Sequence, residues 1–286
     1  MIQRVSSTVV LWSALVGLIW FFGPQAAVWA IALIGILAQH EFYAILSKRG
    51  MLPFNKLGVS LGACMLLGPY YIGTVLMHWA ESDRTSVFLA INTGILAAAV
   101  IVCCVRILNE RESQNRVEAL LATVFGLVLI PFLLQFFVCI FFLGKDENSG
   151  LLLAVWLLAV TKFCDTGALL TGLAIGRTKL APSISPKKTW EGAIGGVVLA
   201  VLVGAGLAYL LRNWLPESFT VLFAAAAALP IAVFGIIGDL VESMIKRLAD
   251  VKDSGSMVPG IGGAFDLIDS VLLSAPVGFL IFLTAL

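Results

Sequence analysis

Residues 118–143 have the sequence EALLATVFGLVLIPFLLQFFVCIFFL, in which no charged side chain follows Glu118. A helix needs roughly 20 consecutive apolar residues to cross the hydrocarbon core of a bilayer, and this stretch is long enough. The whole chain is 60% hydrophobic and 12% charged. Soluble domains average about 45–50% apolar and about 25% charged residues. The composition therefore argues against a water-soluble globule and predicts a membrane protein.

Apolar segments of similar length recur along the whole chain. We expect an all-α, polytopic fold, with residues 1–286 forming a single transmembrane domain of about nine helices. The first two segments are short and are separated only by Gly23-Pro24, so they form two spans, a re-entrant hairpin or one kinked helix. The predicted spans are residues 6–22, 25–39, 58–77, 86–105, 118–143, 151–172, 192–211, 218–238 and 267–286.

The basic residues predict the orientation of these spans. Cytoplasmic loops of membrane proteins carry an excess of Lys and Arg. With the N-terminus placed in the cytoplasm, fourteen of the 18 Lys and Arg residues fall on that side and three on the other, while Lys162 lies inside a span. The asymmetry predicts a cytoplasmic N-terminus.

Charge and cysteine usage exclude several classes of protein. The net charge is +1, so the chain has no polybasic segment of the kind that binds nucleic acid. All five cysteines lie in apolar runs without zinc-ligand spacing, and a thiol in such a setting behaves as a small hydrophobe. We therefore expect neither a disulfide framework nor a structural metal at these positions.

Polar residues that could carry chemistry concentrate in residues 151–286, which we expect to hold the catalytic helices and cytoplasmic loops. Residues 1–150 supply N-terminal helices without such a cluster. Within the span 151–172, Lys162 and Asp165 are three residues apart and share one helix face. Ionisable groups are costly inside a membrane. They form either a structural ion pair or the wall of a polar cavity.

The stretch Ser185-Pro186-Lys187-Lys188-Thr189 predicts an anion site. Ser followed by Pro is typical of a helix N-terminus, which would place both lysines in the first turn. The helix dipole disfavours cations there unless an anion binds to the same turn. The alternative is that the lysines extend to lipid headgroups.

A third stretch contains two pairs of carboxylates at helical spacing, Asp239 with Glu242 and Asp266 with Asp269. Clustered carboxylates without soft ligands suit Mg²⁺, which completes its shell with phosphate oxygens and water. Glycines just before Asp266 would let the backbone approach a ligand. Solvation of helix ends and an ordinary turn are the alternatives. Neither histidine lies in these stretches, so carboxylates, metal and lysines indicate phosphoryl or nucleotidyl transfer.

These stretches together resemble the phosphatidate cytidylyltransferase, or CDP-diacylglycerol synthase, family over roughly residues 150–286. Three blocks carry the resemblance: Asp165-Thr166-Gly167-Ala168, Ser185 to Gly196, and Gly238 to Ser270. The resemblance implies an all-helical membrane enzyme that converts CTP and phosphatidic acid to CDP-diacylglycerol and pyrophosphate. It implies dependence on Mg²⁺, with a monovalent cation such as K⁺ as an option. Ile261 and Leu267 depart from the family pattern, which has histidine and arginine there.

The residues and the resemblance lead to a mechanistic hypothesis for these positions. The expected catalytic residues are Asp239, Asp266, Asp269, Lys187 and Lys188. We expect Mg²⁺ to bind Asp239, Asp266 and Asp165. The nucleotide phosphates are expected at Ser185, Lys187, Lys188, Lys252, Gly262 and Gly263, and the lipid phosphate at Lys246 and Arg247.

Several alternatives stay open at this point. They are a CTP-dependent polyprenol or dolichol kinase, a divergent homologue with altered or lost activity, and an ion-coupled transporter that uses Lys162 and Asp165. A CDP-alcohol phosphotransferase is disfavoured because its Asp-Gly-x-x-Ala-Arg opening is missing. We expect a bacterial plasma membrane location, a cytoplasmic site, membrane lipids as surroundings, no nucleic acid partner, and a homodimer as one option for assembly.

Overall fold

The computed structural model describes residues 17, 21–77, 84–108, 116–144, 146–255 and 262–285. Within these ranges, eight segments are helical, long and apolar enough to cross a membrane. This confirms the predicted all-α, polytopic fold, and the protein is a multi-pass membrane protein. The predicted span 6–22 lies almost wholly outside the described residues, so the count of nine and the side of the N-terminus stay predictions. Leu173 and Leu222 are 76% and 81% exposed on their helices, as expected of side chains that face lipid.

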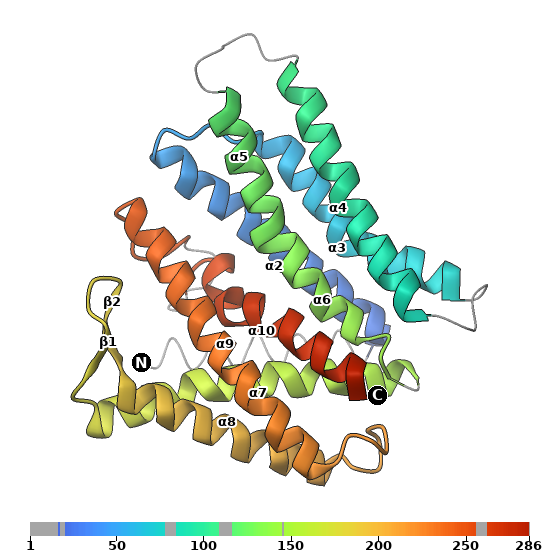
Figure 1. The fold of residues 1–286 in the computed structure, drawn as a ribbon, viewed down its shortest axis with the longest axis vertical. Helices are drawn as coiled ribbons and strands as arrows, with labels where there is room; N and C mark the ends of the chain where they lie inside the picture. The colour runs from blue at the N-terminus through green and yellow to red at the C-terminus, as the bar shows by residue number, and fades with distance from the viewer. Residues whose placement is uncertain are drawn as a thin grey trace. The chain divides into compact units, whose positions relative to one another are not determined.

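The chain divides into two compact units, one of residues 1–138 with 248–268 and one of residues 139–247 with 269–286. Among the described residues, five helices and one π-helical turn lie wholly or mostly in the first unit (Figure 1). They are α2 (Pro24–Lys48), α3 (Asn55–Met77), α4 (Arg84–Leu108), α5 (Arg116–Leu127), η1 (Val128–Phe132) and α6 (Leu133–Ile140). The turn η1 contains Pro131, which lacks the N–H of a regular helix.

Polar side chains join α2 to its neighbours in the first unit. The Tyr43 hydroxyl donates to the carbonyl of Thr123 on α5 at 2.8 Å, and Gln39 Nε2 donates to the carbonyl of Gly58 on α3 at 3.0 Å. Both polar side chains are fully buried. Because these groups have partners inside the protein, α2 continues nine residues beyond the end at residue 39 that hydropathy predicts.

The second unit contains helices α7 (Glu147–Ile175), α8 (Trp190–Leu210) and α9 (Val221–Leu248), and most of α10 (Ala264–Ala285). Helix α7 begins at the N-cap Asp146, whose carboxylate accepts the Ser149 N–H at 2.7 Å. This bond lowers the pKa of the Asp146 carboxyl below its ordinary value. In the core, Trp156 Nε1 donates to the Gly204 carbonyl at 2.8 Å and thereby joins α7 to α8.

Helices α7 and α8 lie side by side (Figure 1). Small residues recur every four positions along the buried face of α8 and allow this approach: Gly192, Gly196, Ala200, Gly204 and Ala208. A Cβ atom at Gly196 would lie 2.6 Å from the backbone oxygen of Cys164 on α7. The glycines of α8 therefore determine how closely α7 and α8 can approach each other.

The predicted helix start at Ser185-Pro186 is wrong. Ser185–Thr189 forms strand β2, which pairs antiparallel with β1 (Lys179–Ala181) in a hairpin between α7 and α8 (Figure 1). Helix α8 begins at Trp190, where the Thr189 hydroxyl accepts the Gly192 N–H at 3.1 Å. The helix start lies after the lysines because Thr189 is also a good N-cap, and the first turn then carries the acidic Glu191 that the helix dipole favours.

Candidate active site

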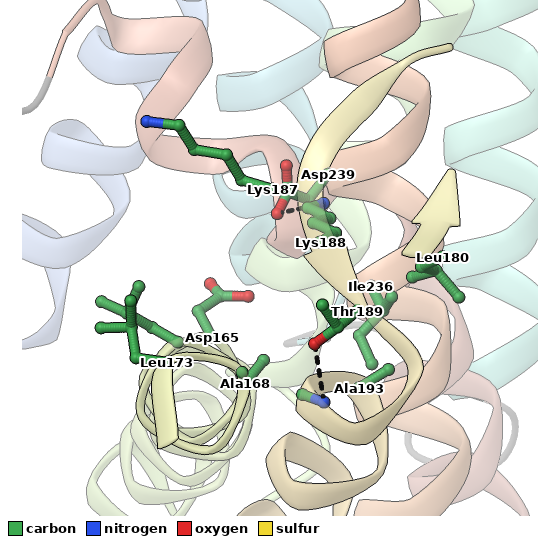
Figure 2. A pocket seen from close by; sticks show the side chains of 13 residues that line it. Asp165, Ala168, Leu173, Leu180, Lys187, Lys188, Thr189, Ala193, Ile236 and Asp239 are labelled. Atoms are coloured by element: carbon green, nitrogen blue, oxygen red, sulfur yellow. Dashed lines mark hydrogen bonds and ion pairs between the residues drawn. The ribbon is translucent and has the colours of Figure 1, made fainter. Parts of the chain in front are cut away.

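A cavity of about 300 Å³ lies between the hairpin and helices α7, α8 and α9 of the second unit. Its polar lining includes Asp165 of α7, Lys187 and Lys188 of β2, and Asp239 of α9 (Figure 2). The remaining wall is mainly apolar, with Ala168, Leu169, Leu173, Leu180, Ala193 and Ile236. A cavity lined by both charged and apolar groups suits a ligand that has both kinds of surface.

The two lysines of β2 point in different directions. Lys188 Nζ lies 2.5 Å from Asp239 Oδ2, and both side chains are about one quarter exposed, at 24% and 27%. The Lys187 side chain extends away from Asp239 (Figure 2). Successive side chains of a strand project to opposite faces, which explains the divergence. Strand β2 therefore contributes two different lysines to the cavity. Lys188 is paired with the Asp239 carboxylate, and Lys187 extends away from it.

Lys162 connects α7 to α10. Its Nζ lies 3.7 Å from Asp165 Oδ2, 3.7 Å from Asp269 Oδ1, and 3.0 Å from Ser270 Oγ. The Ser270 hydroxyl in turn lies 3.1 Å from Asp165 Oδ2. Lys162 and Asp165 thus form an ion pair, as their helical spacing allows, within a larger network that also contains Asp269, and Asp165 also lines the cavity.

Asp239, Glu242 and Asp269 form a carboxylate cluster, with one oxygen of each lying within 4.8 Å of the others. Gly238 makes this possible, because a Cβ atom there would lie 2.5 Å from the Asp269 carbonyl oxygen. Glu242 is 2% exposed, and its Oε1 lies 2.7 Å from Lys246 Nζ. Three hard oxygen donors in this arrangement fit a divalent cation such as Mg²⁺.

Each carboxylate of this cluster has a lysine beside it: Lys188 beside Asp239, Lys246 beside Glu242 and Lys162 beside Asp269. Charges removed from water are costly, and opposite charges nearby offset that cost. The lysines therefore let several carboxylates gather in one place within a bundle of apolar helices.

The predicted residues Asp266, Gly262 and Gly263 lie together in the first unit. Asp266 Oδ2 accepts the N–H of Gly263 at 2.7 Å and the N–H of Ser254 at 3.0 Å. Gly262 has a φ of 126°, which residues with side chains rarely adopt. Lys252 is exposed in the chain just before Ser254. Ile261 lies outside the described residues.

Glu41 of α2 is a site candidate that sequence analysis missed. Its carboxylate accepts the N–H groups of Ala264 and Phe265, each at 3.0 Å, and lies 2.7 Å from the Ser254 hydroxyl. The signal that could have revealed it is a lone carboxylate within an otherwise apolar helix.

The remaining predicted residues lie around the hairpin. Arg247 Nε donates to the carbonyl of Ile184 at 3.4 Å, which joins the end of α9 to the hairpin turn. Lys246 is held by Glu242, as described above. Ser185 lies opposite Ala181 at the start of β2. The predicted roles of these residues are not tested by these contacts and stay predictions.

The sequence profile of the cytidylyltransferase family matches residues 2–285. The chain belongs to the cytidylyltransferase family. This match extends the resemblance noted in residues 150–286 through the N-terminal helices. The family match therefore covers the helices of both units of this cytidylyltransferase-family protein.

Three curated relatives of this cytidylyltransferase-family protein are named phosphatidate cytidylyltransferase. It is 34% identical over 266 residues to the phosphatidate cytidylyltransferase of Thermotoga maritima, covering 92% of this chain and 89% of the relative. It is 29% identical over 279 residues to that of Haemophilus influenzae, with 96% of each chain covered. It is 42% identical over 140 residues to that of Bacillus subtilis, covering 49% of this chain and 50% of the relative.

Proposed function

We propose that this protein is a phosphatidate cytidylyltransferase, which converts CTP and phosphatidic acid to CDP-diacylglycerol and pyrophosphate. Its family and the names of its full-length relatives support this activity. The observation that carries the proposal is the cavity in which lysines of β2, carboxylates of α7 and α9, and an apolar wall face one another. The phosphates of a nucleotide and of a lipid match the lysines, and the apolar part of the lipid matches the apolar wall.

In this proposal, a phosphate oxygen of phosphatidic acid attacks the α-phosphorus of CTP. A new phosphorus–oxygen bond forms as the bond from the α-phosphorus to the bridging oxygen breaks, and pyrophosphate leaves with that oxygen. The attacking group is already an anion at neutral pH, so a strong general base is not required. Lys187 and Lys188, with Ser185, Lys252 and the backbone of Gly262 and Gly263, bind the triphosphate.

The carboxylates of the cluster are the candidates for holding Mg²⁺. Asp239 and Asp269 are the core of this proposal, Glu242 joins them, and Asp165 and Asp266 are supporting residues. A bound Mg²⁺ would neutralise the charge of the triphosphate and of the leaving pyrophosphate. A monovalent cation such as K⁺ is the optional second ion, and Lys162 already supplies a fixed positive charge between Asp165 and Asp269.

The lipid phosphate is assigned to Lys246 and Arg247 at the end of α9. Lys246 is within 2.7 Å of Glu242, so it would have to exchange this partner for the substrate. The site faces the cytoplasm of a bacterial plasma membrane in this proposal, since the basic residues favour that side. Both substrates can then reach it, the nucleotide from water and the lipid from the bilayer. A homodimer is the assembly to test alongside.

The test uses the purified full-length protein in detergent with phosphatidic acid, Mg²⁺ and CTP labelled at the α-phosphate. The proposal expects label in the organic phase as CDP-diacylglycerol, with release of pyrophosphate. EDTA and Asp239→Asn should abolish the signal, whereas Glu118→Gln, which changes an exposed carboxylate of α5, should not.

Other products would identify other functions. CDP together with a phosphorylated lipid would indicate a kinase. Ion flux into sealed vesicles in the absence of CTP would indicate a transporter. A folded protein that yields none of these products, while a related enzyme is active alongside, would contradict the proposal.

A further inference from the structure

Glu41 places a carboxylate inside α2, next to Phe42 and Tyr43, which are fully buried. An ionised carboxylate in such a helix needs strong compensation. Three donors from residues distant in the chain supply it: the Ser254 hydroxyl and the backbone N–H groups of Ala264 and Phe265. Glu41 therefore binds groups that lie outside its own helix.

The two N–H groups belong to the first turn of α10, which begins at Ala264. The first N–H groups of a helix have no partner within the helix and are commonly satisfied by a side chain just before it. The residue before α10 is Gly263, which has no side chain. Glu41 takes this role from another helix, and its negative charge also suits the positive end of the helix dipole.

Ser254 links this cap to Asp266. Its hydroxyl lies 2.7 Å from Glu41 Oε2 and 3.0 Å from Asp266 Oδ2, while its backbone N–H donates to Asp266. A hydroxyl has one proton, so it donates to one carboxylate at a time; when it donates to Glu41, the Ser254 backbone N–H still holds Asp266. The Gly263 N–H donates to the same Asp266 oxygen at 2.7 Å.

The backbone lies close to the two carboxylates. A Cβ atom at Gly255 or at Gly263 would overlap the Glu41 carboxylate, and one at Gly262 would overlap Asp266 Oδ2. Next to these contacts, the rings of Phe42 and Phe265 pack edge to face with centroids 5.7 Å apart. Glu41 thus lies close to the backbone of both Gly255 and Gly263.

We propose that Glu41 is a positioning residue that sets the side chain of Asp266 by fixing Ser254 and the first turn of α10. The proposal rests on the proposed function, in which Asp266 supports the metal-binding carboxylates. Partners that orient a metal ligand typically change affinity or activity by roughly 10- to 100-fold when they are removed. We expect a loss in this range for Glu41→Gln, which keeps the shape but removes the charge and one acceptor oxygen.

Two measurements on the full-length protein test the proposal. Hydrogen exchange in detergent, without nucleotide or metal, should be faster in Glu41→Gln at residues 252–255 and 262–266. Glu118→Gln, a matched change at an exposed carboxylate of the same unit, should leave this exchange unchanged. Steady-state assays should show that Glu41→Gln raises the Mg²⁺ concentration for half-maximal turnover and that Ser254→Ala changes it in the same direction.

A role in stability alone would lower the amount of folded protein without moving the Mg²⁺ midpoint of the folded fraction. That result, or normal exchange and normal turnover in Glu41→Gln, would overturn the proposal. If the wild-type protein makes no CDP-diacylglycerol, the proposed function fails, and the exchange experiment still decides whether Glu41 orders residues 252–255 and 262–266. If turnover occurs but Glu41→Gln is indistinguishable from Glu118→Gln, this inference alone fails.

Discussion

Lys188 Nζ and Asp239 Oδ2 lie 2.5 Å apart and join strand β2 to helix α9 across the cavity. In the proposed function, Lys188 binds a phosphate of the nucleotide and Asp239 binds the metal ion. In the structure they bind one another. Binding of a nucleotide–metal complex would therefore exchange one internal ion pair for two external ones.

Replacing Lys188 separates the two roles of this ion pair. Lys188→Met should raise the KM for CTP and lower the free energy of unfolding by about 1–2 kcal/mol, since it leaves Asp239 without its neighbour in a partly exposed setting. Lys187→Met should raise the KM with a smaller effect on unfolding. The measurements are CTP titrations and thermal unfolding. If Lys188→Met with Asp239→Asn is no more stable than Lys188→Met alone, the pair is not what holds the hairpin.

Lys162 should act as a built-in cation. Lys162→Met leaves Asp165 and Asp269 without the charge between them, and their repulsion should lower turnover. Added K⁺ should restore part of the rate in this variant, whereas choline, which is too large to be bound among carboxylates, should not. Rates at matched ionic strength in the two salts provide the check. Equal rates of the variant in KCl and in choline chloride would contradict this role.

Glu242 could bind the metal ion or only neutralise Lys246, and a double variant distinguishes these two roles. If it is a metal ligand, Glu242→Gln should raise the Mg²⁺ requirement, and adding Lys246→Met should not repair the defect. If it only neutralises Lys246, Glu242→Gln should leave the Mg²⁺ requirement unchanged, and the double variant should recover the stability that Glu242→Gln loses. Mg²⁺ titrations and thermal unfolding of the two variants decide. We expect the first outcome, because Glu242 lies within 4.8 Å of the ligand oxygens of Asp239 and Asp269.

Close packing of α7 and α8 predicts unequal effects of two identical substitutions on α8. Gly196→Ala places a methyl group 2.6 Å from the Cys164 carbonyl oxygen and should destabilise the protein by roughly 1–3 kcal/mol. Gly206→Ala meets no other atom within 4 Å and should be neutral or slightly stabilising through helix propensity. Thermal unfolding in detergent compares them. Equal melting temperatures would show that the helices can move apart without cost.

Hydropathy was sufficient to locate the eight membrane-spanning helices of the described residues, because a span must be apolar over a fixed length. It placed the helix ends less well. Helix α9 runs to Leu248, ten residues past the predicted limit of 238, since Asp239, Glu242 and Lys246 pair with neighbours instead of ending the helix.

The site was predictable where residues are close in sequence. The pair of Lys162 and Asp165 follows from helical spacing alone. The placement of Lys187 and Lys188 on a strand did not follow, because Ser185-Pro186 and Thr189 are both acceptable helix starts and only pairing with β1 decides between them. Glu41 was missed because its partners lie more than 200 residues away in the chain.

The discontinuity of the first unit has a consequence for biosynthesis. Residues 1–138 leave the ribosome early, but residues 248–268, which complete the same unit, follow only after more than a hundred residues of the second. During that interval Glu41 has been made and its partners have not. A nascent chain that ends before α10 would therefore carry the Glu41 carboxylate in α2 without the backbone N–H donors of Ala264 and Phe265 that it has in the folded protein.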